Sequence, residues 1–490
     1  MLRCPAEVEP HLEKIIQAAL AYMSYDPNYS YGSSDDEELQ EEEEDEYEVE
    51  DDDEDDEYED EEEDDDDDES WKVRRSAIRA LKAVVEAKKH NPAVLWTSPY
   101  SVRRGKSAIV AAALVGRFKE REENCRVGVI DCFACLLQVT VAAASADVLS
   151  FTSPDDMDTS SSASSSSGVA IELRNDYAPK LVKACEKIVS VKKGNERSKS
   201  SALALLAALC KAPGGVGAQH QIASVFKHVK PFLSAGTEVG LHREGTSKAL
   251  RLDTLSLVYA MLVSVNHDPV HVRQSLRQTL LPELCQAVKE QWYKVIAEAL
   301  RALASVPRFF VFGYTSQDTE ATKLKERTEV ASGLFTAIEP LLAAHDVDQE
   351  IKECALKACA SLLSSLHASL KAEQKQRLLA LLLDRLENET TRIAAIKTLS
   401  AVAAASDNNG MEGNLIDLSS VLADSISIMA SFLKLQSRSL KQHSLESLDI
   451  IVKNHGSSSL LADGSLYSSV LKEFAPLIVD NDLHLSHLSL

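Results

Sequence analysis

Apolar residues recur at helical spacing along most of this chain. The clearest example is the segment at residues 70–85, SWKVRRSAIRALKAVV. Counted from Arg74, small or apolar residues follow at steps of three, four, seven, ten and eleven. This spacing places them on one face of an amphipathic helix. The pattern is thus a basic residue, then a small residue, then apolar residues at helical spacing.

The same unit recurs, and its further copies begin at Arg126, Lys199, Arg251, Lys352, Arg392 and Lys441. Lys294 fits one residue out of step, and Ser486 begins another copy near the chain end. The last four starts lie roughly 40 to 50 residues apart, which is typical of two-helix HEAT or armadillo repeats. One helical hairpin cannot bury its apolar face alone, so it must stack on the next hairpin. We therefore predict an all-α fold, a single α-solenoid of HEAT/armadillo-like helical repeats over residues 1–490.

Two segments interrupt this pattern, and we predict both to be disordered. The first is an acidic insert at residues 33–69, where 30 of the 35 residues from position 35 are acidic. It falls between a helix predicted at residues 7–25 and its partner at residues 70–88. The second is a Ser-rich loop at residues 142–168. Residues 90–106, with two prolines, are predicted to form an ordinary loop. Neither end shows a polar-faced capping repeat, so we expect an internal segment of a longer solenoid or a truncated gene model.

Composition refines the picture in three ways. Aromatic residues are only 5% of the chain, which favours closely packed helices over strands. The net charge is −25, but the acidic insert accounts for it: without its 30 acids, 47 acidic residues face 52 basic ones. The nine scattered cysteines indicate reduced, buried thiols, and we expect a cytoplasmic and nuclear protein. There is no signal peptide pattern, and the longest apolar run, residues 202–210, is too short to span a membrane.

Several stretches resemble one known family. The most specific are DPNY at residues 26–29 before the acidic insert, SWKVRR at 70–75 and RFKEREEN at 117–124. Shorter matches are LRCP at 2–5, VDQE at 347–350, RLENE at 385–389, MASFLK at 429–434 and LDIIVKN at 448–454. In this order they resemble the middle part of the cullin-associated neddylation-dissociated protein family, also called TATA-binding-protein-interacting proteins. The resemblance covers nearly the whole chain, except the Ser-rich loop and residues 90–106.

That resemblance implies a HEAT solenoid without enzymatic activity. Family members wrap around an un-neddylated cullin with its RING subunit and cover the cullin lysine that would be modified. They also compete with the substrate-receptor module, and so act as exchange factors for cullin–RING ubiquitin ligases of the SCF type. The partner implied for this chain is therefore a cullin–RING complex. Relative to the family, the chain begins inside the solenoid and stops before the region that displaces receptor adaptors.

The repeated basic residues have two interpretations. They form a positive stripe that meets an acidic partner, or a structural ladder that pairs with nearby acids at Glu122, Glu123, Glu196 and Glu389. The cationic residues that cluster in sequence are the better candidates for partner binding, and they are Arg74, Arg75, Arg117, Lys119, Arg121 and Arg126. The acidic insert either mimics nucleic acid or binds histones, or is simply a solvated segment.

Motifs for catalysis or metal binding are weak. Cys132 and Cys135 form a CxxC inside a predicted helix without two further ligands in range. Lys106 resembles the end of a phosphate loop, but the required glycine is replaced by Ser101. We therefore predict no catalytic residues, no cofactor and no metal, and a protein partner rather than nucleic acid, membrane or small-molecule substrate. The alternative is another HEAT binder, a nuclear transport receptor whose acidic loop engages a small GTPase or basic cargo.

Overall fold

The computed structural model describes residues 5–25, 69–102, 106–150, 169, 171–191, 194–212, 219–233, 247–264, 269–405, 416–456, 464–478 and 482–489. The chain divides into two compact units, unit 1 at Met1–Val169 and unit 2 at Ala170–Leu490. Each unit is described by itself, and the single uninterrupted solenoid over 1–490 stays a prediction. The predicted acidic insert at 33–69 lies outside the described residues, apart from Glu69.

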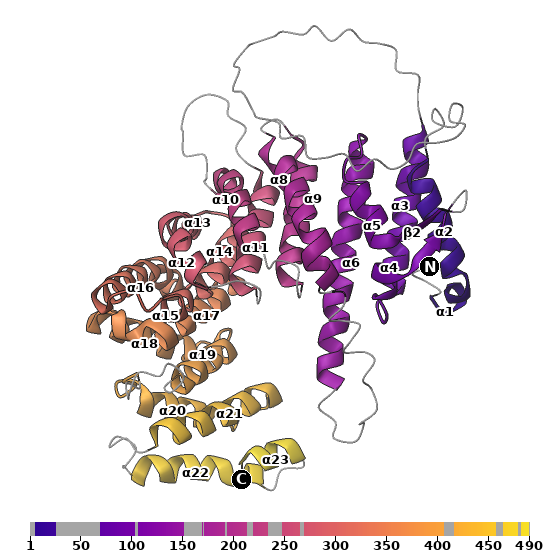
Figure 1. Cartoon of the computed structure of the whole chain (residues 1–490). Helices are drawn as coiled ribbons and strands as arrows, with labels where there is room; N and C mark the ends of the chain where they lie inside the picture. Colours follow the sequence, from indigo (N-terminus) through magenta and orange to yellow (C-terminus); the bar gives the residue numbers. More distant parts are fainter. Residues whose placement is uncertain are drawn as a thin grey trace, which may run out of the picture. The chain divides into compact units, whose positions relative to one another are not determined.

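Unit 1 is built from two helical hairpins with a small strand pair between them (Figure 1). Its elements are α1 (Pro5–Val8), η1 (Glu9–His11), α2 (Leu12–Met23), α3 (Ser70–Ala87), α4 (Val94–Thr97), β1 (Pro99–Ser101), β2 (Ser107–Ile109), α5 (Val110–Gly116) and α6 (Glu123–Ser150). Helix α2 packs on α3, α3 packs on α6, and α5 packs on α6. The predicted pairing across the acidic insert is therefore confirmed.

The segment at 90–106 is not the plain loop that we predicted. It contains α4 and β1, and β1 pairs antiparallel with β2 so that Tyr100 faces Ala108. Trp96 is only 1% exposed and meets Phe133 of α6 edge-on, with ring centroids 5.7 Å apart. Its indole N–H also donates to the Thr140 hydroxyl at 3.0 Å. The prolines suggested a loop, but the apolar residues between them supply part of the unit 1 core.

The predicted Ser-rich loop at 142–168 is also partly wrong. Helix α6 continues to Ser150, so the first nine of these residues are helical. The alanines that follow Val141 are the strongest helix formers and carry the helix past the predicted boundary. Residues 151–168 lie outside the described residues.

Helix α6 is unusually apolar. Over Glu123–Ala143 its mean hydropathy is 1.7, and by length and composition alone it is able to cross a membrane. A core helix passes the same test, and 56% of the tested window is buried inside the protein. The buried side chains include Ile130, Phe133 and Leu137, and the helix packs on α3 and α5. Packing within unit 1 therefore accounts for its composition.

Unit 2 is a stack of helix pairs (Figure 1). Its elements are η4 (Leu173–Tyr177), α8 (Ala178–Ser190), α9 (Glu196–Lys211), α10 (Gln219–Leu233), α11 (Lys248–Val263), α12 (Pro269–Ser275), η5 (Leu276–Leu280), α13 (Leu281–Ala287), α14 (Tyr293–Ala304), α15 (Phe309–Phe312), α16 (Glu320–Ala343), α17 (Gln349–Leu366), η6 (His367–Ser369), α18 (Ala372–Glu387), α19 (Arg392–Ala404), α20 (Leu422–Phe432), α21 (Arg438–His455), α22 (Gly464–Ile478) and α23 (Leu483–Ser489).

The second helices of these pairs form the spine of unit 2. Helices α9, α11, α14, α17, α19, α21 and α23 pack one on the next in chain order. The buried faces of α11, α14, α17 and α19, and most of that of α21, belong to one hydrophobic core whose members run from Leu233 to Ile451. Each hairpin buries its apolar face on its neighbours, so the predicted all-α α-solenoid of HEAT/armadillo-like repeats is confirmed.

Contacts between successive second helices report the length of one repeat. The Ser264 hydroxyl donates to the Cys210 carbonyl at 2.8 Å, and the two residues are 54 positions apart. The Thr398 hydroxyl donates to the Leu356 carbonyl at 3.3 Å across 42 positions. These separations fit HEAT or armadillo repeats and exceed the roughly 34 residues of a tetratricopeptide repeat.

Candidate partner-binding surface

The repeated basic residue has a fixed place in the second helices of unit 2. Four of these helices begin at a polar N-cap whose side chain accepts a backbone N–H, and the caps are Asn195, Ser247, Asp348 and Ser437. The basic residues Lys199, Arg251, Lys352 and Lys441 each lie four positions after their cap, and each donates its backbone N–H to the carbonyl of that cap. The repeating pattern thus marks the first turn of the second helix.

A cation in the first turn of a helix is unfavourable unless its side chain finds negative charge elsewhere. Several of these side chains turn back to a main-chain carbonyl at the end of the first helix of their own hairpin, or in the turn that follows it. The bonds are Arg74 to Tyr25 at 3.1 Å, Arg126 to Glu120 at 3.4 Å, Lys352 to His345 at 2.7 Å and Arg392 to Glu387 at 3.2 Å. The basic residue therefore closes the turn between the two helices of its hairpin.

Other side chains of the same set reach forward to the next hairpin. Arg251 donates to Glu290 at 2.8 Å, and Lys199 lies 5.6 Å from the ring centroid of Phe232. Of the two interpretations, the structural ladder describes these contacts, although its partners differ from those we expected. Arg126 and Arg392 bind main-chain carbonyls, and Lys199 lies over an aromatic ring.

A buried glutamate organises the clustered candidates in unit 1. The side chain of Glu120, in the turn between α5 and α6, is only 5% exposed. Its carboxylate lies 3.5 Å from Nε of Arg74 and pairs with the guanidinium of Arg117. A buried carboxylate needs such partners, since an unpaired charge in the interior is costly. Sequence reasoning missed Glu120, because nothing distinguishes it from Glu122 and Glu123 in the string RFKEREEN.

The structure therefore places the six predicted partner-binding residues in three kinds of surroundings: three are engaged in internal contacts, two are exposed and one is half-buried. Arg74, Arg117 and Arg126 are engaged within unit 1, through Glu120 and nearby carbonyls. Lys119 and Arg121 are exposed. Arg75 is half-buried, with its guanidinium 5.9 Å from the ring centroid of Trp71.

Unit 2 contains a second charge cluster, between α12–η5 and α16, that the sequence did not indicate. Arg273 makes a two-pronged contact with Asp318 at 3.0 and 3.2 Å, and its Nε lies 3.6 Å from Glu326. Arg277 binds Glu326 at 2.7 Å and Glu329 at 2.8 Å. The partners are 45 to 53 positions apart in sequence, so no local motif indicates them.

This cluster, the α16 clamp, shifts the pKa values of two of its groups. The hydrogen bond from Arg273, helped by the backbone of Thr315, lowers the pKa of Asp318 to about 2. Burial, together with the charge of Glu326, raises the pKa of Tyr314 to about 12. The Tyr314 ring also lies 4.2 Å from the guanidinium carbon of Arg273. These contacts tie the α12–η5 segment to the first half of α16.

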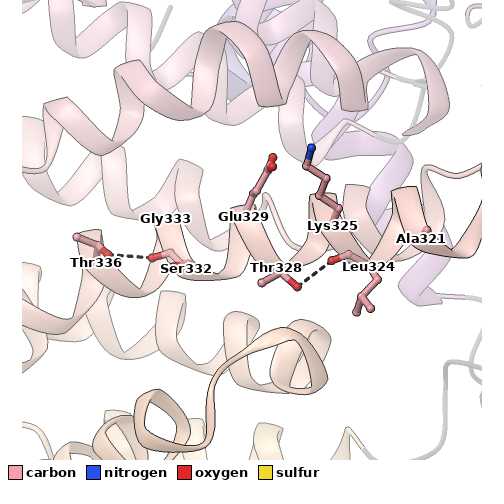
Figure 2. A pocket seen from close by; sticks show the side chains of 8 residues that line it. All are labelled: Ala321, Leu324, Lys325, Thr328, Glu329, Ser332, Gly333 and Thr336. Carbon is pink, nitrogen blue, oxygen red and sulfur yellow. Dashed lines mark hydrogen bonds between the residues drawn. The ribbon is translucent and has the colours of Figure 1, made fainter.

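A groove of about 760 Å³ follows one face of α16 (Figure 2). Its lining residues are Ala321, Leu324, Lys325, Thr328, Glu329, Ser332, Gly333 and Thr336. The hydroxyls of Thr328 and Thr336 donate to carbonyls of their own helix at 2.8 and 2.9 Å. No activated nucleophile or acid–base pair stands in this groove, so its geometry offers no site for catalysis.

The cysteines of the CxxC lie within α6. Burial raises the pKa of the Cys132 thiol and also that of Cys135, which disfavours the thiolate that metal binding requires. Across the part of the chain that the structure describes, no three His, Cys, Asp or Glu side chains are grouped to hold a metal ion.

Comparisons with known proteins converge on one family. Residues 219–359 match the family model described as "CAND1-like, TPR repeats". The chain is 33% identical over 492 residues to Cullin-associated NEDD8-dissociated protein 1 of Dictyostelium discoideum, covering 99% of this chain and 34% of that protein. It is 31% identical over 487 residues to Cullin-associated NEDD8-dissociated protein 2 of Mus musculus, covering 99% and 34%.

The chain spans about a third of the length of the curated relatives it matches. It is also similar to a chain in a solved structure of Kap95p with RanGDP, at 12% identity and a TM-score of 0.49, covering 85% of this chain and 45% of that chain. Similarity at that level carries no information about partners. The sequence matches extend over the whole chain, and this chain belongs to the family of cullin-associated NEDD8-dissociated proteins.

Proposed function

We propose that this protein is a non-enzymatic scaffold that binds an un-neddylated cullin–RING complex. In this role it regulates the assembly and exchange of cullin–RING ubiquitin ligases of the SCF type. The observation that carries the proposal is sequence similarity over 99 to 100% of the chain to proteins named as cullin-associated and NEDD8-dissociated. A nuclear transport receptor is not favoured, because these relatives are named for cullins.

The architecture supports binding rather than chemistry. A stack of hairpins presents a long surface in which each repeat contributes a few side chains, and such surfaces suit large protein partners. In the α16 groove, the hydroxyls of Thr328 and Thr336 bond within their own helix, and Glu329 pairs with Arg277. Burial raises the pKa of the Cys132 thiol of α6, which disfavours the reactive thiolate. Both features support a scaffold that performs no reaction of its own.

A capture experiment with the purified full chain tests this proposal. The chain is immobilised and offered a purified cullin–RING complex, either unmodified or carrying NEDD8 on the cullin. We expect capture of the unmodified complex and at least tenfold weaker capture of the modified one. A small GTPase of the nuclear transport class serves as the control and should stay unbound. Equal capture of both cullin forms, or of the GTPase alone, would refute the proposal.

The regulatory role is measured separately from binding. A ligase assembled with one fluorescent substrate-receptor module is mixed with an excess of a second, unlabelled module. The rate of replacement is then followed with and without this protein. We expect a faster rate in its presence. An unchanged rate with cullin bound would leave a cullin-binding protein without exchange activity.

A further inference from the structure

Two short segments of unit 1 carry a local excess of positive charge. Residues 70–79, at the start of α3, carry four basic residues and no acidic one. Residues 117–126, across the α5–α6 turn, carry four basic and three acidic residues. Together these 20 residues hold a net charge of +5, which equals the positive excess of the entire chain outside the acidic insert. All other parts of the chain outside that insert are therefore neutral in sum.

The two segments are held together by Glu120. Its carboxylate contacts Arg74 of α3 and Arg117 at the end of α5. Its carbonyl accepts from Arg126 of α6 at 3.4 Å. The backbone of the turn is fixed as well, because the Glu120 N–H donates to the Arg117 carbonyl at 3.1 Å. A cationic turn that is already ordered loses little conformational entropy when it binds a partner.

Within this turn the side chains alternate between inside and outside. Phe118 and Glu120 are buried, whereas Lys119 and Arg121 are exposed. Neither exposed cation has an ion-pair or hydrogen-bond partner among the described residues. On α3, Lys72 and Arg75 each lie 5.9 Å from the ring centroid of Trp71. Lys119 and Arg121 therefore face solvent, Lys72 also pairs with Glu69, and Arg75 lies half-buried beside Trp71.

We propose that Arg75, Lys119 and Arg121 form a contact surface for a carboxylate-rich face of the protein partner. This inference rests on the proposed function in one respect, because it takes the cullin–RING complex as that partner. Arginine guanidinium groups bind carboxylates in a planar, two-pronged geometry, and a lysine adds a point charge beside them. Lys119 and Arg121 lie on the fixed α5–α6 turn and Arg75 lies on helix α3, all without the internal carboxylate that occupies Arg74 and Arg117.

The net charge of −25 does not prevent such a contact. At physiological ionic strength the screening length is about 8 Å, so charges act mainly on their immediate surroundings. A local excess of positive charge therefore attracts a local excess of carboxylates. The alternative occupant of the surface is the chain's own acidic run at residues 35–68, which precedes α3 directly in sequence.

The test uses the full chain with two matched double variants. Lys119→Glu with Arg121→Glu reverses two charges of the surface. Lys357→Glu with Lys397→Glu removes two exposed lysines on α17 and α19 in unit 2 and serves as the control. Each variant is titrated with the un-neddylated cullin–RING complex and, separately, with a fluorescent peptide of ten glutamates at 0.05 and 0.15 M salt. If the charge reversal disturbs the fold, Lys119→Gln with Arg121→Gln replaces it.

We expect the unit 1 variant to lose at least tenfold in affinity for both ligands, and the control to change less than twofold. Salt should weaken wild-type binding and have little effect on residual binding of the unit 1 variant. If the wild type binds cullin and the unit 1 variant binds it equally well, the surface inference fails while the proposed function stands. If the wild type ignores cullin but binds the peptide through Lys119 and Arg121, the proposed function fails, and with it the choice of the cullin–RING complex as partner, while the carboxylate-binding role of the surface stands.

Two further outcomes overturn the inference. The first is an absence of binding to either ligand by the wild type. The second is peptide binding that emerges only when residues 35–68 are replaced by a Gly/Ser linker, because the acidic run would then be the occupant of the surface.

Discussion

The charge clusters of the two units differ in their balance of acidic and basic side chains. In unit 1 a single buried carboxylate, Glu120, faces Arg74 and Arg117 and is surrounded by further cations. In unit 2 two arginines, Arg273 and Arg277, are divided among three carboxylates. The unit 1 cluster depends on one acid and leaves positive charge in excess. In the unit 2 cluster the positive charge is divided among three carboxylates, so no positive charge is in excess.

This difference indicates that charge fastens helices together in one cluster and is available for a partner in the other. A cluster with as many acids as bases, or more, is satisfied internally and fastens helices together. A cluster with more basic than acidic side chains leaves some cations without an internal carboxylate, and these cations are available to bind an acidic partner. The comparison predicts that losing one acid is severe in unit 1 and mild in unit 2.

The largest expected effect is the loss of the unit 1 carboxylate. Glu120→Ala leaves the guanidinium groups of Arg74 and Arg117 without their acid, and breaking such a buried contact costs about 3 kcal/mol. Hydrogen exchange of the α3 and α6 amides should then accelerate roughly 100-fold, since each 1.4 kcal/mol is a factor of ten. Mass spectrometry of peptides from each unit measures this directly.

The matched control is Glu326→Ala in the α16 clamp. Arg273 keeps Asp318 and Arg277 keeps Glu329, so we expect a loss of only about 1 kcal/mol in unit 2. Equal losses for the two substitutions would show that the units do not differ in how they distribute charge.

Two helical glycines extend the comparison to packing. A Cβ placed on Gly128 of α6 would lie 3.2 Å from Cγ2 of Ile78 on α3, whereas one placed on Gly333 of α16 meets nothing within 4 Å. Gly128→Leu should therefore cost about 2 kcal/mol through overpacking. Gly333→Ala should stabilise unit 2 by up to about 1 kcal/mol, because alanine is the better helix former. Urea unfolding, followed unit by unit with hydrogen exchange, distinguishes the two, and a stabilising Gly128→Ala would contradict the close approach of α3 and α6.

The smallest expected effect is a pH dependence confined to unit 2. The folded protein holds the pKa of Asp318 at about 2, below its ordinary value of 3.8. A depressed acid contributes its full stability above the ordinary value and loses it as the pH falls through the folded value. The difference in unit 2 stability between wild type and Asp318→Asn should be constant above about pH 4 and disappear near pH 2. A difference that persists unchanged at pH 2 would show that Arg273 does not depend on the ionised carboxylate.

The hairpins could be predicted from sequence because their signals are local. The spacing after Arg74, Lys352 or Arg392 repeats within a dozen residues, and each start was found within a few positions. The strand pair and the burial of Trp96 were missed, because two prolines outweighed a short apolar run between them. The end of α6 was missed because an Ala-rich stretch was assigned to the Ser-rich segment that follows it.

The charge clusters could not be predicted, since their partners are far apart in sequence. Arg273 and Asp318 are 45 positions apart, and Arg74 and Glu120 are 46. Only the stacking of hairpins brings them together. One signal was available: four second helices of unit 2 begin at an Asn, Ser or Asp that lies four positions before the repeated basic residue. That signal would have placed Lys199, Arg251, Lys352 and Lys441 in the framework of the fold.

The bond between Arg74 and the Tyr25 carbonyl has a consequence for how this gene can change. It closes the turn between α2 and α3 at its base, regardless of what the chain does between positions 25 and 69. Each doubling of a loop adds only about 0.6 kcal/mol of closure entropy, so the hairpin tolerates long additions there. At this turn, new sequence can therefore be gained, lost or exchanged while the helices on either side keep their register.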